Sequence, residues 1–173
     1  MSSESQKSIF DIILEKVGMT PTTYEWELRV DGASRGNPGP SGAGIYLSKN
    51  KKSVVKEGFY LKTKTNNEAE YLALLIGVLL LKKEIKDQEG VVIISDSQLI
   101  IRQLEGIYKI KKPELKKKHK AILTELGDIP CQFKHIEREY NTVADLLANK
   151  GVDTKKSLSL KFLDILRTYE IFI

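Results

Sequence analysis

The stretch YEWELRVDGASRGNPGP, residues 24–40, decides the fold because it joins a strand pattern to a turn-rich segment through one carboxylate, Asp31. Residues 24–30 alternate apolar and charged side chains, the pattern of a strand with one buried face. Residues 31–40 contain three glycines and two prolines, more than a simple turn needs. Glycine-rich backbone can approach a ligand closely. The stretch therefore predicts a strand that ends at an acid and is followed by a binding loop, with a proline-stiffened turn as the alternative.

The segments that follow indicate a mixed sheet covered by helices. Two more strand patterns, 42–50 and 53–62, are joined by a lysine-rich turn, so the first three strands are expected to form an antiparallel meander. The run VVIIS at 91–95 is typical of a strand buried on both faces. Helices are predicted at 66–85, from near Ser97, at 113–126 and at 142–151, and a strand at 131–137. Asn66 is expected to cap the first of these helices, and Asn141 and Gly151 to begin and end the last. This order predicts an α/β fold with a five-stranded mixed sheet.

Length, composition and charge limit the number of domains, the kind of partner and the compartment that we expect. The chain has 173 residues and a formal net charge of +5, which fits one domain and is compatible with a polyanionic partner. Cys131 is the single cysteine, so an internal disulfide is excluded and a reducing compartment is the simpler expectation. The sequence contains no apolar run of membrane-spanning length and no secretory signal pattern, so we expect a cytoplasmic protein without a membrane partner.

Four carboxylates stand at the ends of predicted elements. Asp31 and Asp96 end the first and fourth strands, and Glu70 and Asp145 lie in the first turns of two helices. Each alone is more often a turn, cap or dipole-compensating residue. If the first and fourth strands are parallel neighbours, however, both aspartates reach one sheet edge and the other two acids can close over them. Such a cluster suits hard divalent cations, and a pair of them can promote in-line displacement at phosphorus.

Four segments carrying these acids resemble the catalytic blocks of type 1 ribonuclease H, in its compact archaeal and bacterial branch. They are DGASRGNPGPSGAG, TNNEAEYLAL, ISDSQLIIRQLEG and REYNTVADLLANKG, and the resemblance covers about residues 24–152. It implies the strand order 3-2-1-4-5 with helices on both faces. It also implies that Asp31, Glu70, Asp96 and Asp145 bind two Mg²⁺ or Mn²⁺ ions, and that the protein cleaves the RNA strand of RNA–DNA hybrids to 3′-hydroxyl and 5′-phosphate ends.

The resemblance also implies a set of substrate contacts. Backbone groups of the glycine-rich segment would meet ribose 2′-hydroxyls, which distinguish RNA from DNA. Thr65 and Asn67 match a pocket for a phosphate of the DNA strand, and Gln98 would add a side-chain contact. A lysine run at 109–120 adjoins the expected substrate handle, although a charge run is usually a solvated face. The expected substrate-binding residues are Ser34, Arg35, Gly36, Asn37, Thr65, Asn67, Gln98, Lys109, Lys111 and Lys112.

The loop before Asp145 departs from the family pattern. Many members carry a histidine there, whereas this chain reads HIEREYNTVAD. We interpret His135 as a structural strand residue and expect Arg138 to contact the scissile or product phosphate in place of that histidine. Arginine is a permanent cation and cannot shuttle protons near neutral pH. Glu68 is interpreted as a capping or surface charge, and His119 as an exposed residue.

The flanks lie outside the resemblance. Residues 1–23 are expected to form an extension with a short amphipathic helix, and residues 153–173 an apolar tail that packs on the body of a monomer. A dimer contact through the termini is the alternative. Two other functions also stay open from the sequence: a non-cleaving module that binds hybrids or double-stranded RNA, and a nuclease of the same fold that acts on double-stranded RNA or on a DNA strand.

Overall fold

Three long strands joined by tight turns form the antiparallel half of the sheet in this computed structural model, which describes residues 23–173. The strands are β1 (Thr23–Ser34), β2 (Gly39–Lys49) and β3 (Lys52–Lys64). β1 does not end at Asp31 as predicted, because its last three residues stay in register with β2. The expected binding loop is therefore shorter and consists of residues 35–38.

Two further strands complete the sheet in parallel orientation. β4 (Glu89–Ser95) pairs with β1, and β5 (Cys131–His135) pairs with β4. The strand order is β3-β2-β1-β4-β5, which confirms the predicted five-stranded mixed sheet and its order. Because β1 and β4 are parallel neighbours, their carboxyl ends lie at the same edge of the sheet.

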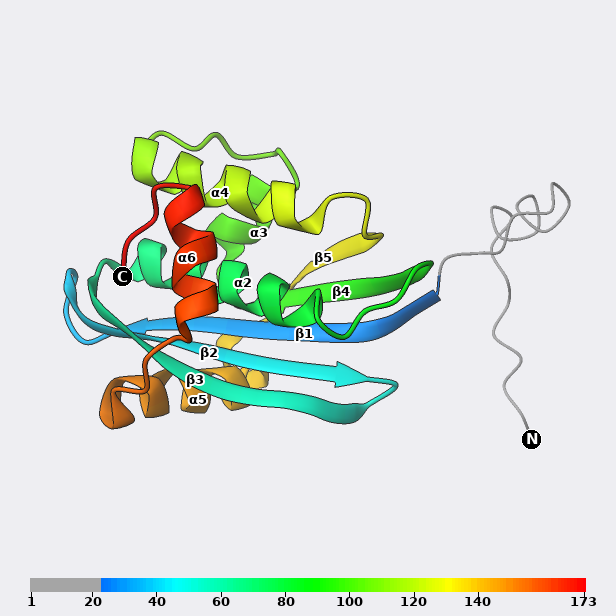
Figure 1. Ribbon diagram of the computed structural model, residues 1–173, viewed down its shortest axis with the longest axis horizontal. Coiled ribbons are helices and arrows are strands. Elements are labelled where there is room, and N and C mark those ends of the chain that lie inside the picture. The colour runs from blue at the N-terminus through cyan, green and yellow to red at the C-terminus, as the bar shows by residue number, and fades with distance from the viewer. Residues whose placement is uncertain (1–22) are drawn as a thin grey trace, which may run out of the picture.

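Helices cover both faces of this sheet (Figure 1). On one face α2 (Asn66–Leu81) packs against β1 and β2, and α4 (Pro113–Leu126) packs on α2. The short α3 (Gln98–Leu104) follows β4, and α5 (Thr142–Thr154) lies on the opposite face against β2 and β3. Eleven of the sixteen residues of α2 are buried, because the sheet and the outer helices enclose it. An enclosed helix can be apolar on all sides, and α2 forms the centre of the hydrophobic core.

Glycines in β2 allow α5 to approach the sheet at backbone distance. A β-carbon at Gly44 would lie 2.0 Å from the carbonyl oxygen of Ala144, and one at Gly42 would lie 2.1 Å from that of Ala148. Any larger residue would have to displace the helix backbone. The spacing of α5 from the sheet, and with it the position of Asp145, therefore depends on these glycines.

The start of α2 is set by a capping box. The Thr65 hydroxyl accepts a hydrogen bond from the backbone N–H of Glu68, and the Glu68 carboxylate accepts one from the backbone N–H of Thr65. The cap is thus Thr65, not Asn66 as predicted, because the Thr65 side chain reaches the free N–H groups. The capping role of Glu68 is confirmed. The helix ends at Leu81, four residues earlier than predicted.

The predicted end of the last helix at Gly151 is also wrong. A β-carbon there would lie 2.5 Å from the carbonyl oxygen of Phe59, so this glycine permits close packing on β3 and does not end the helix. α5 continues to Thr154, and Lys155 takes the left-handed backbone conformation, with φ of 51°, that ends it.

The apolar tail packs on the body of the protein. α6 (Leu160–Thr168) buries Phe162 and Leu166, and Ile171 beyond it is also buried. Figure 1 shows α6 on the same side of the sheet as α2 and α4. Intramolecular packing of the tail is confirmed, while a dimer through the termini stays a prediction. The predicted N-terminal helix lies outside the described residues, and none of the helices at 23–173 is long and apolar enough to cross a membrane.

We expect Gly44→Ala to lower the free energy of unfolding by about 2–4 kcal/mol, because the new methyl group overlaps the backbone of α5. Ser53→Ala, at an exposed position of β3, serves as the control and should change it by less than about 0.5 kcal/mol. Urea unfolding followed by circular dichroism measures both. Equal stabilities of the two variants would contradict the close approach of α5.

Candidate active site

Three acids from distant parts of the chain meet at the edge where β1 and β4 run side by side. Asp31 lies in β1, Asp96 directly follows β4, and Glu70 lies in the first turns of α2. One carboxylate oxygen of each lies within 4.8 Å of the others. Asp31 is 5% exposed. The predicted convergence of these three residues is therefore observed, and the parallel pairing of β1 with β4 produces it.

Gly32 of β1 allows α2 to approach that strand closely. A β-carbon at this position would lie 2.2 Å from the backbone nitrogen of Glu70, so only glycine lets the first turns of α2 contact β1. The backbone N–H of Gly32 in turn donates a hydrogen bond to the Glu70 carboxylate. The residue after Asp31 thus determines how close Glu70 comes to Asp31.

The clustering raises the pKa values of its buried members. Burial, followed by the charges of Asp96 and Asp145, raises the pKa of Asp31 to about 7. Burial, followed by the charges of Asp31 and Asp96, raises the pKa of Glu70 well above its usual range. Oε2 of Glu70 is buried without a hydrogen-bond partner. A site with closely spaced hard oxygen ligands, one of them unpaired, fits a divalent cation such as Mg²⁺ or Mn²⁺.

The fourth predicted acid lies beside this cluster and not within it. Asp145 stands in the first turn of α5, where one of its oxygens accepts a hydrogen bond of 3.0 Å from Arg138. Its charge contributes to the raised pKa of Asp31, so it is near enough to act on the cluster. Arg138 belongs to the short helix η1 (Arg138–Tyr140), and its side chain is 79% exposed. Arg138 lines the same cleft of 520 Å³ as Asp31, Glu70 and Asp96, and its phosphate contact stays a prediction.

The expected substrate contacts divide into two groups. Ser34, Arg35 and Asn67 line the cleft with the acids. The Asn37 side chain accepts a hydrogen bond from the backbone N–H of Asn66, which joins the turn at 35–38, including Gly36, to the start of α2. The second group lies outside this cleft: Thr65, which is engaged in the capping box, and the exposed residues Gln98, Lys109, Lys111 and Lys112. The substrate roles of both groups stay predictions.

Two asparagines at the site were missed by sequence reasoning. Asn141 was expected to cap α5, but its side chain makes no capping bond. It is 1% exposed, and its amide group donates to the carbonyl of Val30 at 3.0 Å and lies 3.5 Å from an Asp96 oxygen. It therefore connects β1 to the residue that follows β4. Asn149 lines the cleft one helical turn after Asp145, a spacing that could have indicated it.

The two histidines differ in how well they were predicted. His135 lies in β5 as expected, although the strand ends there, two residues earlier than predicted, and its Nε2 lies 3.2 Å from the carbonyl oxygen of Asp96. The prediction of an exposed His119 is wrong. Its ring is half-buried at an edge-to-face angle to Tyr71, and its Nε2 is buried without a partner, because α4 packs this side onto α2. Lys118 beside it is also buried, near Glu68, so the lysine run is not a uniform solvated face.

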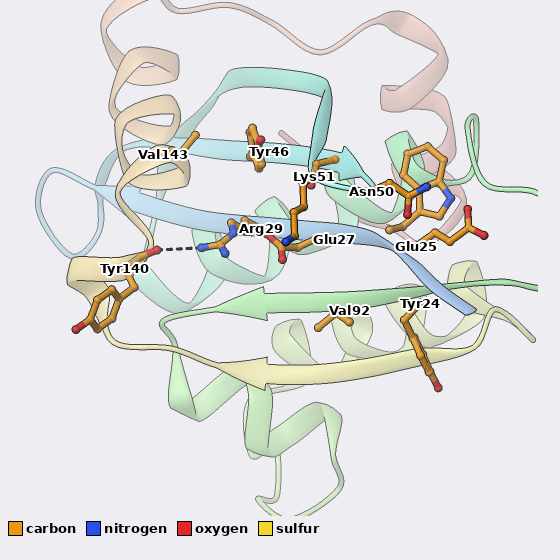
Figure 2. A pocket seen from close by; sticks show the side chains of 12 residues that line it. Tyr24, Glu25, Glu27, Arg29, Tyr46, Asn50, Lys51, Val92, Tyr140 and Val143 are labelled. Carbon is orange, nitrogen blue, oxygen red and sulfur yellow. Dashed lines mark hydrogen bonds and ion pairs between the residues drawn. The ribbon is translucent and has the colours of Figure 1, made fainter. Parts of the chain in front are cut away.

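A larger hollow of 610 Å³ lies away from the acids, on the sheet face beside α5. Figure 2 shows Tyr24 and Tyr140 at its two ends with Glu27 and Arg29 between them. Arg29 donates a hydrogen bond of 3.0 Å to the Tyr140 carbonyl and pairs with Glu27 at 2.5 Å. It therefore anchors η1, the segment that carries Arg138, to β1. No acid in its lining belongs to the cluster of described carboxylates that could hold a metal ion.

In the absence of divalent ions, we expect Asp31→Asn to raise the free energy of unfolding at pH 8 by about 1–3 kcal/mol. The folded-state pKa of Asp31 is about 7, above its ordinary value of 3.8. Ionisation of this carboxyl therefore destabilises the fold increasingly as the pH rises from about 4 to about 7. The gain should therefore be small at pH 3.5, where the carboxyl is mostly protonated in both states. Thermal unfolding in EDTA across this range measures it, with Asp128→Asn, at an exposed position, as the control. A gain that persists unchanged at pH 3.5 would contradict the electrostatic cause.

Comparison with known proteins identifies relatives among the ribonucleases H. A family profile described as Reverse transcriptase-like matches residues 29–151. Ribonuclease HI of Halobacterium salinarum is 36% identical over 130 residues, which cover 71% of this chain and 62% of that protein. Ribonuclease H of Pseudomonas putida is 35% identical over 144 residues, covering 73% and 93%. A bifunctional protein of Mycobacterium tuberculosis is 32% identical over 134 residues, but the chain spans only 35% of its length.

Solved structures of ribonuclease H1 share the fold. The Halobacterium salinarum enzyme matches with a TM-score of 0.71 at 33% identity, covering 75% of this chain and 98% of that one. LC11 ribonuclease H1, solved in complex with an RNA/DNA hybrid, matches with a TM-score of 0.69 at 34% identity, covering 75% and 97%. The strand order, the acid cluster and these similarities confirm what the four sequence segments indicated: this chain belongs to the type 1 ribonuclease H family.

Proposed function

We propose that this protein is a divalent-metal-dependent endoribonuclease that hydrolyses the RNA strand of RNA–DNA hybrids, leaving 3′-hydroxyl and 5′-phosphate ends. The observation that carries the proposal is the group of Asp31, Glu70 and Asp96, whose oxygens lie within 4.8 Å of one another at the edge of an open cleft. Binding of nucleic acid alone would not require three mutually repelling carboxylates, one of them largely buried. The similarity to a relative solved with an RNA/DNA hybrid supports the choice of substrate.

The acids are the residues that would hold the ions. A pair of ions would be held by Asp31, Glu70 and Asp96 of the cluster together with Asp145 beside it. When bound, Mg²⁺ or Mn²⁺ supplies Lewis-acid activation of water and neutralises charge on the leaving 3′-oxygen. The raised pKa of Asp31 and the unpaired Oε2 of Glu70 support this assignment, since a cation would remove the cost of ionising both groups.

The remaining cleft residues would position the substrate. Ser34 and Arg35 border the acids at the end of β1, where backbone groups and short side chains can contact 2′-hydroxyls of an A-like duplex. Arg138 would hold the phosphate beside the acids, because its guanidinium is exposed to the cleft on one side and fixed by Asp145 on the other. Its permanent charge suits phosphate binding and excludes proton transfer near neutral pH.

We expect wild-type protein to cleave a labelled hybrid in Mg²⁺ or Mn²⁺ and not in EDTA. Asp96→Asn should lower the cleavage rate by more than about 100-fold, because it removes an ionised ligand oxygen. Asp128→Asn should cleave at the wild-type rate. A gel assay on hybrid, RNA duplex and DNA duplex tests activity and substrate choice together. Hybrid cleavage that survives both EDTA and Asp96→Asn would exclude the metal-dependent reaction, and faster cleavage of RNA duplex would change the substrate class.

We expect Arg138→Ala to lower turnover by about tenfold or more, equivalent to about 1.4 kcal/mol of lost stabilisation. Arg138→Lys keeps the charge but loses the planar, bidentate guanidinium, so its turnover should lie between that of Arg138→Ala and that of the wild type. Single-turnover and steady-state rates measure the effect, and thermal unfolding controls for changes in the fold. Unchanged rates in both regimes would refute a role for this guanidinium.

A further inference from the structure

Three lysines come together where the C-terminal segment, residues 169–173, crosses the end of β3 and the start of α4. The ammonium group of Lys64 donates to the carbonyl of Phe172 at 2.9 Å, and that of Lys62 donates to the carbonyl of Ile173 at 3.2 Å. Lys117 of α4 forms an ion pair with Glu170. We call Lys62, Lys64 and Lys117 the lysine group.

The lysine group lies next to the catalytic cleft. Lys64 directly precedes the cap of α2, and its carbonyl accepts hydrogen bonds from the hydroxyls of Ser34 at 2.9 Å and Ser41 at 3.1 Å. Ser34 itself lines the cleft that contains the acids. On the other side, Lys64 and Lys117 border a separate hollow of 390 Å³. The C-terminus lies beside the N-terminal end of α2 (Figure 1), so the lysine group adjoins the cleft through Lys64 and its bond to Ser34.

The group keeps most of its capacity to bind anions in the free protein. Each ammonium has three donors, and the two carbonyls of the C-terminal segment occupy one donor on each of two lysines. Glu170 carries the one acidic side chain among residues 169–173, and this side chain is 72% exposed. An ion pair this exposed is screened by solvent and contributes little to stability, so a phosphate can replace the carboxylate at little cost.

We propose that the lysine group is a second binding surface for the phosphate backbone of the hybrid, and that Glu170 masks part of it in the free protein. The inference rests on the proposed function, since it assumes that a nucleic-acid duplex enters the neighbouring cleft. The duplex backbone leaving the acids passes over Lys64 and then Lys117, and it displaces the Glu170 carboxylate. Binding through these lysines reads charge and not sequence.

The first test measures hybrid binding by fluorescence anisotropy in EDTA, so that no cleavage intervenes. Lys64→Gln and Lys117→Gln should each weaken binding about three- to tenfold and make the slope of log affinity against log salt less negative by about 0.9. Lys86→Gln, at an exposed position five residues after the end of α2, removes the same charge and should change affinity less than twofold. If the lysine-group variants have the same hybrid affinity and salt dependence as Lys86→Gln, the proposed binding surface is wrong.

The second test unmasks the surface with a variant at an exposed position. Glu170→Gln should bind the hybrid about two- to fivefold more tightly than wild type, because Lys117 no longer has a competing carboxylate. Asp164→Asn is the matched control: it changes the net charge equally and removes the partner of Arg167 on α6. Equal gains from both variants would show an effect of net charge alone and would overturn the masking by Glu170.

Failure of this inference can be distinguished from failure of the proposed function. If wild type binds the hybrid with the expected differences among variants but does not cleave it in Mg²⁺ or Mn²⁺, the surface stands and the proposed reaction is wrong. If wild type cleaves the hybrid while all lysine-group variants match their controls, the reaction stands and the surface is wrong. Hybrid binding too weak to measure in the wild-type protein would also overturn the surface.

Discussion

The contact between β1 and α2 at Gly32 sets the chemistry of the whole site. A side chain at this position would collide with the backbone of residues 69 and 70, and the helix would have to move away from the strand. With glycine there, Glu70 comes within a few ångströms of Asp31 in a poorly solvated corner, and both carboxyls acquire raised pKa values. The folded protein thus holds two acids in an arrangement that is unfavourable without a cation. That cost is the physical origin of the site's expected preference for divalent ions.

The site is assembled from two layers of the fold that pack on opposite faces of the sheet. Asp31, Asp96 and Glu70 depend on β1, β4 and α2, whereas Asp145 comes from α5 on the far side. Glycines of β2 and β3 allow α5 to lie at backbone distance from the sheet. Asn141 links the layers, because it belongs to the start of α5 and its amide reaches the carbonyl of Val30 beside the acids. Small changes in helix packing could therefore move Asp145 and Arg138 while leaving the three clustered acids in place.

Charge on this side of the molecule is arranged in neighbouring regions of opposite sign. The clustered acids would repel a nucleic-acid backbone, and lysines beside the start of α2 would attract it. The tail brings an acidic side chain and two backbone oxygens to these lysines, so the segment that packs on the hydrophobic core also changes the charge around the lysine group. If the lysine group binds the hybrid as proposed, stability and substrate affinity would be coupled here, because one short stretch of chain would contribute to both.

The sequence by itself determined the order of the elements, the five-stranded sheet and the positions of the acids. These follow from local patterns: alternation in residues 24–30, the apolar run at 91–95, and acids placed just after strands or in first helical turns. The capping role of Glu68 was predictable for the same reason, since its partner lies three residues away. Type 1 ribonuclease H membership followed from four ordered segments and did not require any contact between them.

Only the tertiary structure decided features that depend on residues far apart in the chain. Gly151 looked like a helix stop, but it is needed where α5 packs against Phe59, 92 positions earlier. Asn141 looked like a cap, but its amide reaches Val30 and approaches Asp96. His119 was predicted to be exposed, but the packing of α4 on α2 places its ring against Tyr71. In each case a residue type with a strong local preference serves a distant partner, because burial and close packing outweigh local propensity once the layers assemble.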